Sequence, residues 1–187
     1  MELSTIILIA IGLSMDALAV SISSGLVIPG VNASHGLKIG FFFGLFQALM
    51  PVLGWLAGTT VRAYIVSVDH WIAFILLVFV GVKMLHGAVA DRKDEKLLDP
   101  SRLDVLLVLS VATSIDALAV GLTFAMLDVP LFPAVVIIGI TTFLISGAGV
   151  YLGKRAGAAI GKLVEIAGGI ILIGIGLKIL LEHLLLE

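Results

Sequence analysis

The chain has 187 residues, of which 60% are hydrophobic and only 13% are charged, and its formal net charge at pH 7 is −2. With a mean hydropathy of +1.25, it is too apolar to be a single soluble domain with a polar surface. It lacks a Lys/Arg-rich stripe with interleaved aromatic residues, which argues against nucleic-acid binding. The absence of cysteine excludes disulfides, thiolate metal ligands and a cysteine nucleophile.

Six apolar stretches follow one another along the chain, each long enough to cross a bilayer as a helix of about 20 residues. Hydrocarbon cannot satisfy backbone N–H and C=O groups, and the stretches are too long and too uniformly apolar for barrel strands. We interpret the first stretch as a span, not a cleaved signal peptide, because no basic residues precede it. We predict an all-α polytopic membrane protein with six transmembrane helices, at residues 3–24, 36–58, 71–89, 103–127, 131–153 and 163–181.

The second half of the chain repeats the first. Glycines recur at an offset of 95 residues, pairing Gly44 with Gly139, Gly54 with Gly149 and Gly58 with Gly153. Their spacing of four residues also lets helix backbones approach closely in a membrane. We interpret the chain as a three-helix repeat over 1–90, a charged linker over 91–102 and a second three-helix repeat over 103–187. Because three is odd, the second repeat enters the membrane from the opposite side, which gives inverted repeats typical of transporters.

The basic residues predict the orientation. They concentrate in the connections on one side of the predicted spans: Lys38, Arg92, Lys93, Lys96, Arg102, Lys154, Arg155 and Lys162. The positive-inside rule places that side in the cytoplasm and both termini outside.

The first and fourth spans carry nearly the same motif. Ser14-Met15-Asp16-Ala17-Leu18-Ala19-Val20 returns 100 residues later as Ser114-Ile115-Asp116-Ala117-Leu118-Ala119-Val120. A charge at the centre of a membrane helix costs about 2.5–3.5 kcal/mol on insertion scales, so such residues are rarely without function. Two of them at equivalent places predict one shared site near the midplane.

Further oxygen ligands follow from helical spacing. Ser23 and Thr123 stand seven residues after Asp16 and Asp116, on the same helix faces. Gln47, in the second span, is the best additional oxygen donor. Carboxylate, hydroxyl and amide oxygens suit a hard divalent cation such as Mn²⁺, Mg²⁺ or Ca²⁺, and two carboxylates balance its charge.

Several of these candidates have a purely structural alternative. Ser14 and Ser114 lie two residues before the acids, roughly 200° around the helix, so they reach a shared ligand only if the helix is distorted. Hydroxyls in helices also bond back to their own backbone carbonyls, and Gln47 could form a hydrogen bond between helices. Met15 could add a thioether that favours a transition metal, but its counterpart is Ile115, so it could equally fill the core.

Two copies of a Ser-x-Asp-Ala-Leu-Ala-Val motif in helices one and four of a six-helix chain closely resemble the bacterial MntP-type manganese efflux pumps, a branch of the LysE-like exporter superfamily. The resemblance covers essentially the whole chain, including His70-Trp71-Ile72-Ala73-Phe74. It implies Mn²⁺ as substrate, export as direction, a bacterial inner membrane as location and an essential role for Asp16 and Asp116. Some members carry an acid in helix two where this chain has Gln47, so the charge of the site can differ by one.

The predicted activity is therefore secondary transport and not enzymatic catalysis, with no resident cofactor. Moving a 2+ ion out of a negative cell works against about 4.6 kcal/mol per 100 mV, and the chain has no Walker-type ATP-binding loop. We predict exchange against protons, because burial favours a protonated carboxyl group and a bound cation favours the ionised one.

Two other functions stay open at this point. An exporter of another divalent cation or of an amino acid would use the same fold. An intramembrane aspartyl protease also uses two membrane aspartates, but its Tyr-Asp and Gly-x-Gly-Asp signatures precede neither acid here. A purely structural membrane protein would leave the duplicated acid unexplained. The sequence does not specify an oligomeric state.

Overall fold

The computed structural model describes residues 2–28, 30–65 and 100–156, with scattered residues between 71 and 86 and between 163 and 181. In this part of the chain lie four long helices, which are α1 (Leu3–Val27), α2 (Ala33–Ile65), α4 (Leu103–Met126) and α5 (Leu131–Ala156). Each is long and apolar enough to cross a membrane. The all-α prediction is confirmed for these four spans, whereas the predicted third and sixth spans and the linker lie largely outside the described residues.

Helix α2 is longer than predicted because polar residues extend it past its apolar run. The prediction ended at Gly58, but the hydroxyls of Thr59 and Thr60 donate to the carbonyl oxygens of Leu56 and Ala57, at 2.9 and 2.7 Å. These side chains are satisfied within the helix itself, so the helix continues to Ile65.

Short turns join the consecutive helices. Between α1 and α2, Gly30 adopts a φ of +66°, which a glycine adopts without strain. Asn32 then caps α2, since its Oδ1 accepts the His35 backbone N–H at 3.2 Å while His35 Nδ1 accepts the Asn32 N–H at 3.4 Å. Between α4 and α5, Asp128 takes the left-handed conformation, with a φ of +50°.

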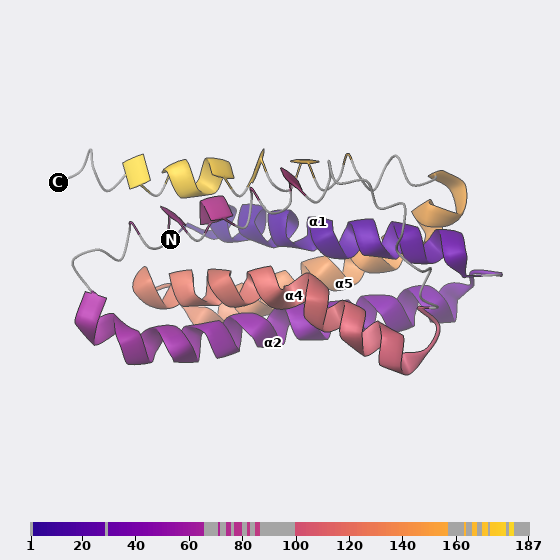
Figure 1. Ribbon diagram of the computed structural model, residues 1–187, viewed down its shortest axis with the longest axis horizontal. Helices are drawn as coiled ribbons and strands as arrows, with labels where there is room; N and C mark the ends of the chain where they lie inside the picture. The colour runs from indigo at the N-terminus through magenta and orange to yellow at the C-terminus, as the bar shows by residue number, and fades with distance from the viewer. Residues whose placement is uncertain are drawn as a thin grey trace.

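The four helices form a bundle in which α1 and α5 run in one direction and α2 and α4 in the other (Figure 1). The extensive contacts are α1 with α5, α2 with α4 and α2 with α5, while α1 and α4 touch over a smaller area. We call the first two contacts the α1–α5 seam and the α2–α4 seam. Each seam joins the first helix of one predicted repeat to the second helix of the other.

Glycines allow both seams to close tightly. In the α1–α5 seam, a Cβ atom at Gly153 would overlap the carbonyl oxygen of Ile22. In the α2–α4 seam, a Cβ atom at Gly54 would overlap the carbonyl oxygen of Leu118. This confirms the sequence-based expectation that these small residues bring helix backbones together.

The bundle is apolar outside and partly polar inside. Large hydrophobic side chains are exposed on its outer faces, among them Leu37, Phe41, Leu53, Phe132, Ile140 and Leu144. Polar side chains are buried within it, among them Ser14, Gln47, Ser114, Asp116 and Thr142. Exposed hydrocarbon around a polar interior is the arrangement of a membrane protein.

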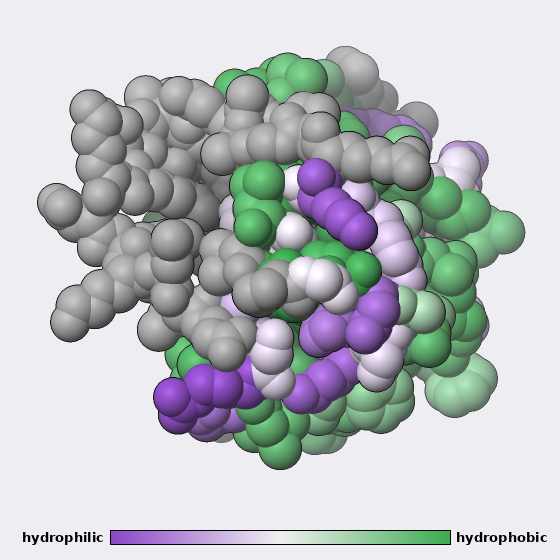
Figure 2. Space-filling view, turned by 90° about the vertical axis from the view of Figure 1, so that its right-hand side faces the viewer, coloured by the Kyte–Doolittle hydropathy of each residue, from purple (hydrophilic) through white to green (hydrophobic). Residues whose placement is uncertain are grey.

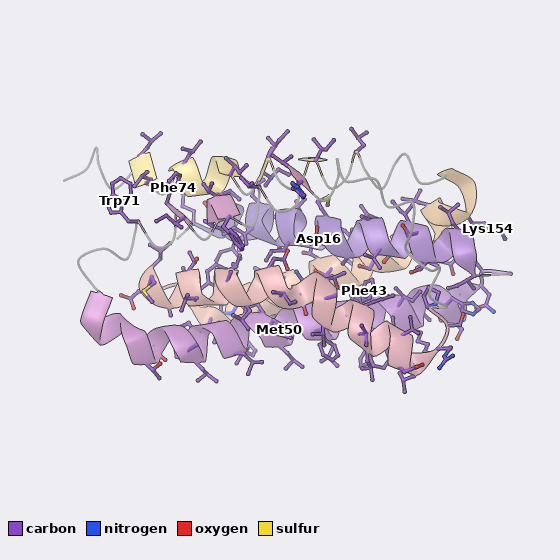
Figure 3. The ribbon with its side chains drawn as sticks, viewed as in Figure 1. Asp16, Phe43, Met50, Trp71, Phe74 and Lys154 are labelled. Atoms are coloured by element: carbon purple, nitrogen blue, oxygen red, sulfur yellow. The ribbon has the colours of Figure 1, made fainter. Side chains whose placement is uncertain are left out.

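One end of the bundle carries basic side chains, and we call it the basic end. Lys38 at the start of α2 donates to the carbonyl oxygen of Ser101 at 2.7 Å, and Arg102 pairs with Asp104 at 2.8 Å. Figure 2, which views this end, shows hydrophilic residues gathered there, and Figure 3 places Lys154 at the same end. Three of the predicted cytoplasmic basic residues therefore lie together.

Two buried apolar clusters occupy the bundle at different heights. The basic-end cluster consists of Ala17, Ile28, Val31, Ile39, Phe43, Leu106 and Val150. The far-end cluster consists of Ile6, Ile9, Ala10, Leu13, Leu77, Ala117, Val120, Phe124, Val129, Ala134, Ile138 and Ile175. Asp16 lies between Phe43 and Met50 along the length of the bundle, near its middle (Figure 3).

Candidate functional site

The two aspartates lie near the midpoints of their helices, Asp16 in α1 and Asp116 in α4. The Asp116 residue is only 2% exposed, whereas Asp16 is half-buried. Helices α1 and α4 are in contact. Neither carboxylate therefore lies on a fully exposed outer face, and Asp116 is enclosed by protein.

The Asp116 carboxylate is positioned by its own helix. Its Oδ1 accepts the backbone N–H of Ala117 at 2.8 Å. A hydrogen bond to a carboxylate oxygen stabilises the charged form and is stronger than one between neutral groups.

Gln47 brings oxygen atoms from α2 to the level of the aspartates. It is fully buried, and its Nε2 donates to the Leu13 carbonyl oxygen of α1 at 3.3 Å. Its Oε1 is buried and has no hydrogen-bond partner among the described residues. Pro51 has no N–H to donate to the main-chain carbonyl of Gln47. The structural alternative for Gln47, a hydrogen bond between helices, is therefore realised, while its amide oxygen has no partner among the described residues and could bind a cation.

The hydroxyls of the duplicated motif bond back to their own helices. Ser14 Oγ donates to the Ala10 carbonyl oxygen, and its oxygen lies 3.3 Å from Thr142 Oγ1 of α5. Ser114 Oγ lies 2.7 Å from the carbonyl oxygen of Ser110 and 3.1 Å from that of Val111. The structural alternative is thus realised for both serines. A hydroxyl that donates in this way still has lone pairs for a cation.

The equivalent hydroxyls Ser23 and Thr123 have different surroundings. Ser23 is exposed and donates to Ala19 O at 3.1 Å. Thr123 is fully buried and donates to Ala119 O at 3.2 Å. Only Thr123 therefore faces the interior. Met15 packs against the far-end cluster, which is the core-filling alternative for its side chain.

Seven further buried polar residues in the described part of the chain were not among the predicted site residues: Thr5, Ser21, Ser24, Ser110, Thr113, Thr142 and Ser146. A signal for two of them exists in the sequence. Ser21 stands seven residues after Ser14, and Ser146 stands four residues after Thr142, so each continues a polar line along one helix face.

The described residues contain no group of three or more His, Cys, Asp or Glu side chains that could hold a metal ion. A cation bound at this level by the described helices must therefore complete its shell with neutral oxygens or water. Hard cations such as Mn²⁺ and Mg²⁺ accept such mixed oxygen shells, while zinc and copper prefer sulfur and imidazole.

Comparison with known proteins identifies the family. A family model described as "Putative manganese efflux pump" matches residues 30–180. The chain belongs to this family. It is a family of transporters and not of enzymes, as the sequence predicted.

Curated relatives cover the chain from end to end. A "Putative manganese efflux pump MntP" of Sorangium cellulosum is 51% identical over 192 residues, which cover 100% of both chains. Proteins of the same name from Syntrophotalea carbinolica and Methanosarcina acetivorans are 51% and 50% identical over 186 and 185 residues, each covering 99% of both chains. No solved structure matches the chain.

Proposed function

We propose that this protein exports Mn²⁺ from the cytoplasm through a midplane site formed by Asp16 and Asp116. The observation that carries the proposal is the burial of Asp116, a carboxylate only 2% exposed at the middle of a membrane-spanning helix. Its counterpart Asp16 lies at the equivalent place in α1. The names of the relatives supply the metal.

The proposed ligand set combines charge with neutral oxygens. Asp16 and Asp116 balance the two positive charges of the ion, and Gln47 Oε1 adds an amide oxygen. The hydroxyls of Ser14 and Ser114 are buried and can turn their lone pairs to the ion, whereas the buried Thr123 lies about 10.5 Å along α4 from Asp116 and would instead line the path of the ion. Ser23 and Met15 are weaker ligands, because Ser23 is exposed and Met15 packs with the far-end cluster.

Two inverted repeats related by a pseudo-twofold axis would present this site to either side of the membrane. In support, α1 and α4 run in opposite directions (Figure 1). Equivalent positions also make equivalent contacts, because Gly54 meets Leu118 and Gly149 meets Leu18. The equivalent glycines Gly44 and Gly139 lie against each other, as expected for residues close to such an axis.

The two apolar clusters are suited to act as alternating barriers. They lie toward opposite ends of the bundle and contain residues that are equivalent in the two repeats: Ala17 with Ala117, Phe43 with Ile138, Ile39 with Ala134, and Leu106 with Ile6. The two apolar clusters, one on each side of the polar layer, interrupt any continuous path of water through the bundle. Parting one cluster at a time would open the site to one side only.

The basic end faces the cytoplasm in this proposal, with both termini outside a bacterial inner membrane. Export from there works against about 4.6 kcal/mol per 100 mV for a 2+ ion. Exchange for two protons would be electroneutral and would draw on the pH gradient. The carboxylates bind the metal when ionised on the cytoplasmic side and release it outside as they take up protons.

Transport in vesicles with an imposed pH gradient tests this function. We expect Mn²⁺ flux that rises with the gradient and disappears in Asp16→Asn and Asp116→Asn. Flux that needs both aspartates but ignores the gradient would refute proton coupling. Flux of another divalent cation or an amino acid in preference to Mn²⁺ would refute the substrate assignment.

A further inference from the structure

Two buried hydroxyls of the α1–α5 seam have no hydrogen-bond partner among the described residues, Ser21 Oγ and Ser146 Oγ. Neither side chain has exposed surface. Other buried hydroxyls in these helices donate to a carbonyl three or four residues earlier, as those of Ser14, Ser24, Ser110, Thr113, Ser114 and Thr123 do. Leaving a buried hydroxyl unsatisfied is unfavourable, so two on one seam call for a ligand.

Both hydroxyls continue the polar line that begins at the midplane. Ser14 and Thr142 meet across the seam at 3.3 Å. From there, Ser21 is two helical turns further along α1 and Ser146 one turn further along α5, each on the same face as its predecessor. Gly149 keeps the seam narrow at this level, since a Cβ atom there would lie 3.0 Å from Ser21 Cβ. The line runs toward the basic end.

The other seam has no hydroxyl at the equivalent positions. The counterparts of Ser21 and Ser146 are Gly121 and Pro51. A Cβ atom at Gly121 would overlap the carbonyl oxygen of Pro51, so the two backbones touch directly there. The same place in the fold is therefore polar in one seam and tightly closed in the other.

We infer that Ser21 and Ser146 form a second, uncharged station for a hydrated divalent cation, between the aspartates and the basic end. Hydroxyl oxygens bind hard cations directly or through their water shell. Without a carboxylate the station binds weakly, which lets the ion move on to the charged site. The inference rests on the proposed transport function, because it assigns the station to the path of the same ion.

Backbone contacts close the station toward the basic end in this structure. A Cβ atom at Gly25 would overlap the carbonyl oxygen of Val150, and one at Gly153 would overlap that of Ile22. An ion from the cytoplasm therefore reaches Ser21 and Ser146 only when α1 and α5 separate at this end.

Cysteine accessibility tests the station directly, because the native chain has no cysteine. Ser21→Cys and Ser146→Cys are compared with the control variant Ala125→Cys. Ala125 is 2% exposed, and its Cβ faces Gly58 in the α2–α4 seam. Inside-out vesicles are treated with a membrane-impermeant methanethiosulfonate, with and without MnCl₂.

We expect both seam cysteines to react at least about 10-fold faster than the Ala125→Cys control, because separation of α1 and α5 exposes them to water. Saturating MnCl₂ should slow both reactions by about 3-fold or more, because the ion occupies the station. Reaction as slow as that of the control would overturn the inference. Fast reaction that MnCl₂ leaves unchanged would also overturn it, since the seam would then be wet without holding the cation.

A second measurement separates a transport role from a packing role. Ser21→Ala with Ser146→Ala should leave thermal stability unchanged or higher, because two unsatisfied hydroxyls are removed, and should slow Mn²⁺ export several-fold. Unchanged export in this double variant would refute the station. Failure of the proposed function can be told apart from failure of the station. If the proposed function is wrong, Asp16→Asn and Asp116→Asn will export Mn²⁺ normally, regardless of how fast the seam cysteines react.

Discussion

The α1–α5 and α2–α4 seams pair equivalent helices of the two halves but differ in chemistry. Each is closed by glycines against a neighbouring backbone, at Gly153 in the first and at Gly54 in the second. Among the described residues, only the α1–α5 seam contains a hydrogen bond between hydroxyls, Ser14 with Thr142, and two buried serines without a partner follow it. Under the proposed alternating access, the shared packing would let the bundle open on either side. The difference in chemistry would let the two sides handle the ion differently.

Removing either aspartate should have the largest effect on transport, because the proposed site contains both carboxylates. We expect Asp16→Asn and Asp116→Asn each to lower Mn²⁺ export by about 100-fold or more, because each removes half of the neutralising charge. Manganese tolerance of a strain without its own exporters is the measurement. Asp104→Asn is the matched control, since that exposed acid pairs with Arg102 at the basic end. Tolerance retained in either site variant would contradict a shared site.

Gln47 and Thr142 are equivalent residues with different partners. Gln47 reaches the Leu13 carbonyl of α1, while Thr142 meets Ser14. We expect Gln47→Leu, which keeps similar volume, to weaken Mn²⁺ binding by about 10-fold, the usual range for a neutral supporting ligand. Isothermal titration of the purified protein measures it. An affinity equal to that of the unmodified protein would leave Gln47 with a packing role only.

Alanine substitutions at the equivalent glycines Gly54 and Gly149 should destabilise the protein by different amounts. At Gly54 the new Cβ would overlap the Leu118 backbone, whereas at Gly149 it would first meet the flexible end of the Leu18 side chain, at 2.6 Å. We expect Gly54→Ala to lower the free energy of unfolding by about 2–3 kcal/mol and Gly149→Ala by about half as much. The Leu18 side chain that faces Gly149 can move aside, whereas the backbone that faces Gly54 cannot. Thermal unfolding in detergent compares them. Equal losses would mean that the seams are equally tight at this level.

The smallest predicted difference is between Thr123 and Ser23. Thr123→Ala should lower export by about 3-fold, as expected for one buried hydroxyl beside the path of the ion, and Ser23→Ala should change it by less than about 2-fold. The reason is that Thr123 is buried and Ser23 is exposed. Initial rates of Mn²⁺ flux in vesicles separate the two. A larger loss at Ser23 would place the ion on the opposite side of α1.

The length and spacing of the apolar runs sufficed to predict the described helices. Helices α4 and α5 begin where the sequence predicted and α1 begins at Leu3, while α2 runs on to Ile65. The end of α2 was missed because hydropathy marks where lipid ends, and a helix can continue beyond it when residues such as Thr59 satisfy their own hydroxyls.

The candidate site was predictable in its acids and less so in its neutral ligands. A duplicated carboxylate in an apolar run is conspicuous, so Asp16 and Asp116 stand out at once. The sequence could not separate Thr123 from Ser23, and it aligned Ser21 with Ser14 without showing that their face is buried, because helices that are apolar all round carry no amphipathic stripe to mark the inner face. Only the packing of the helices, α1 against α5 and α2 against α4, fixes which hydroxyls are buried.

A metal-bound structure with anomalous scattering measured at the manganese edge tests the central claim most directly. The account predicts one strong manganese peak near the midplane, within coordination distance of carboxylate oxygens from both Asp16 and Asp116, with Gln47 Oε1 turned toward it. A peak ligated by only one of the two aspartates, or one located away from both, would contradict the shared site.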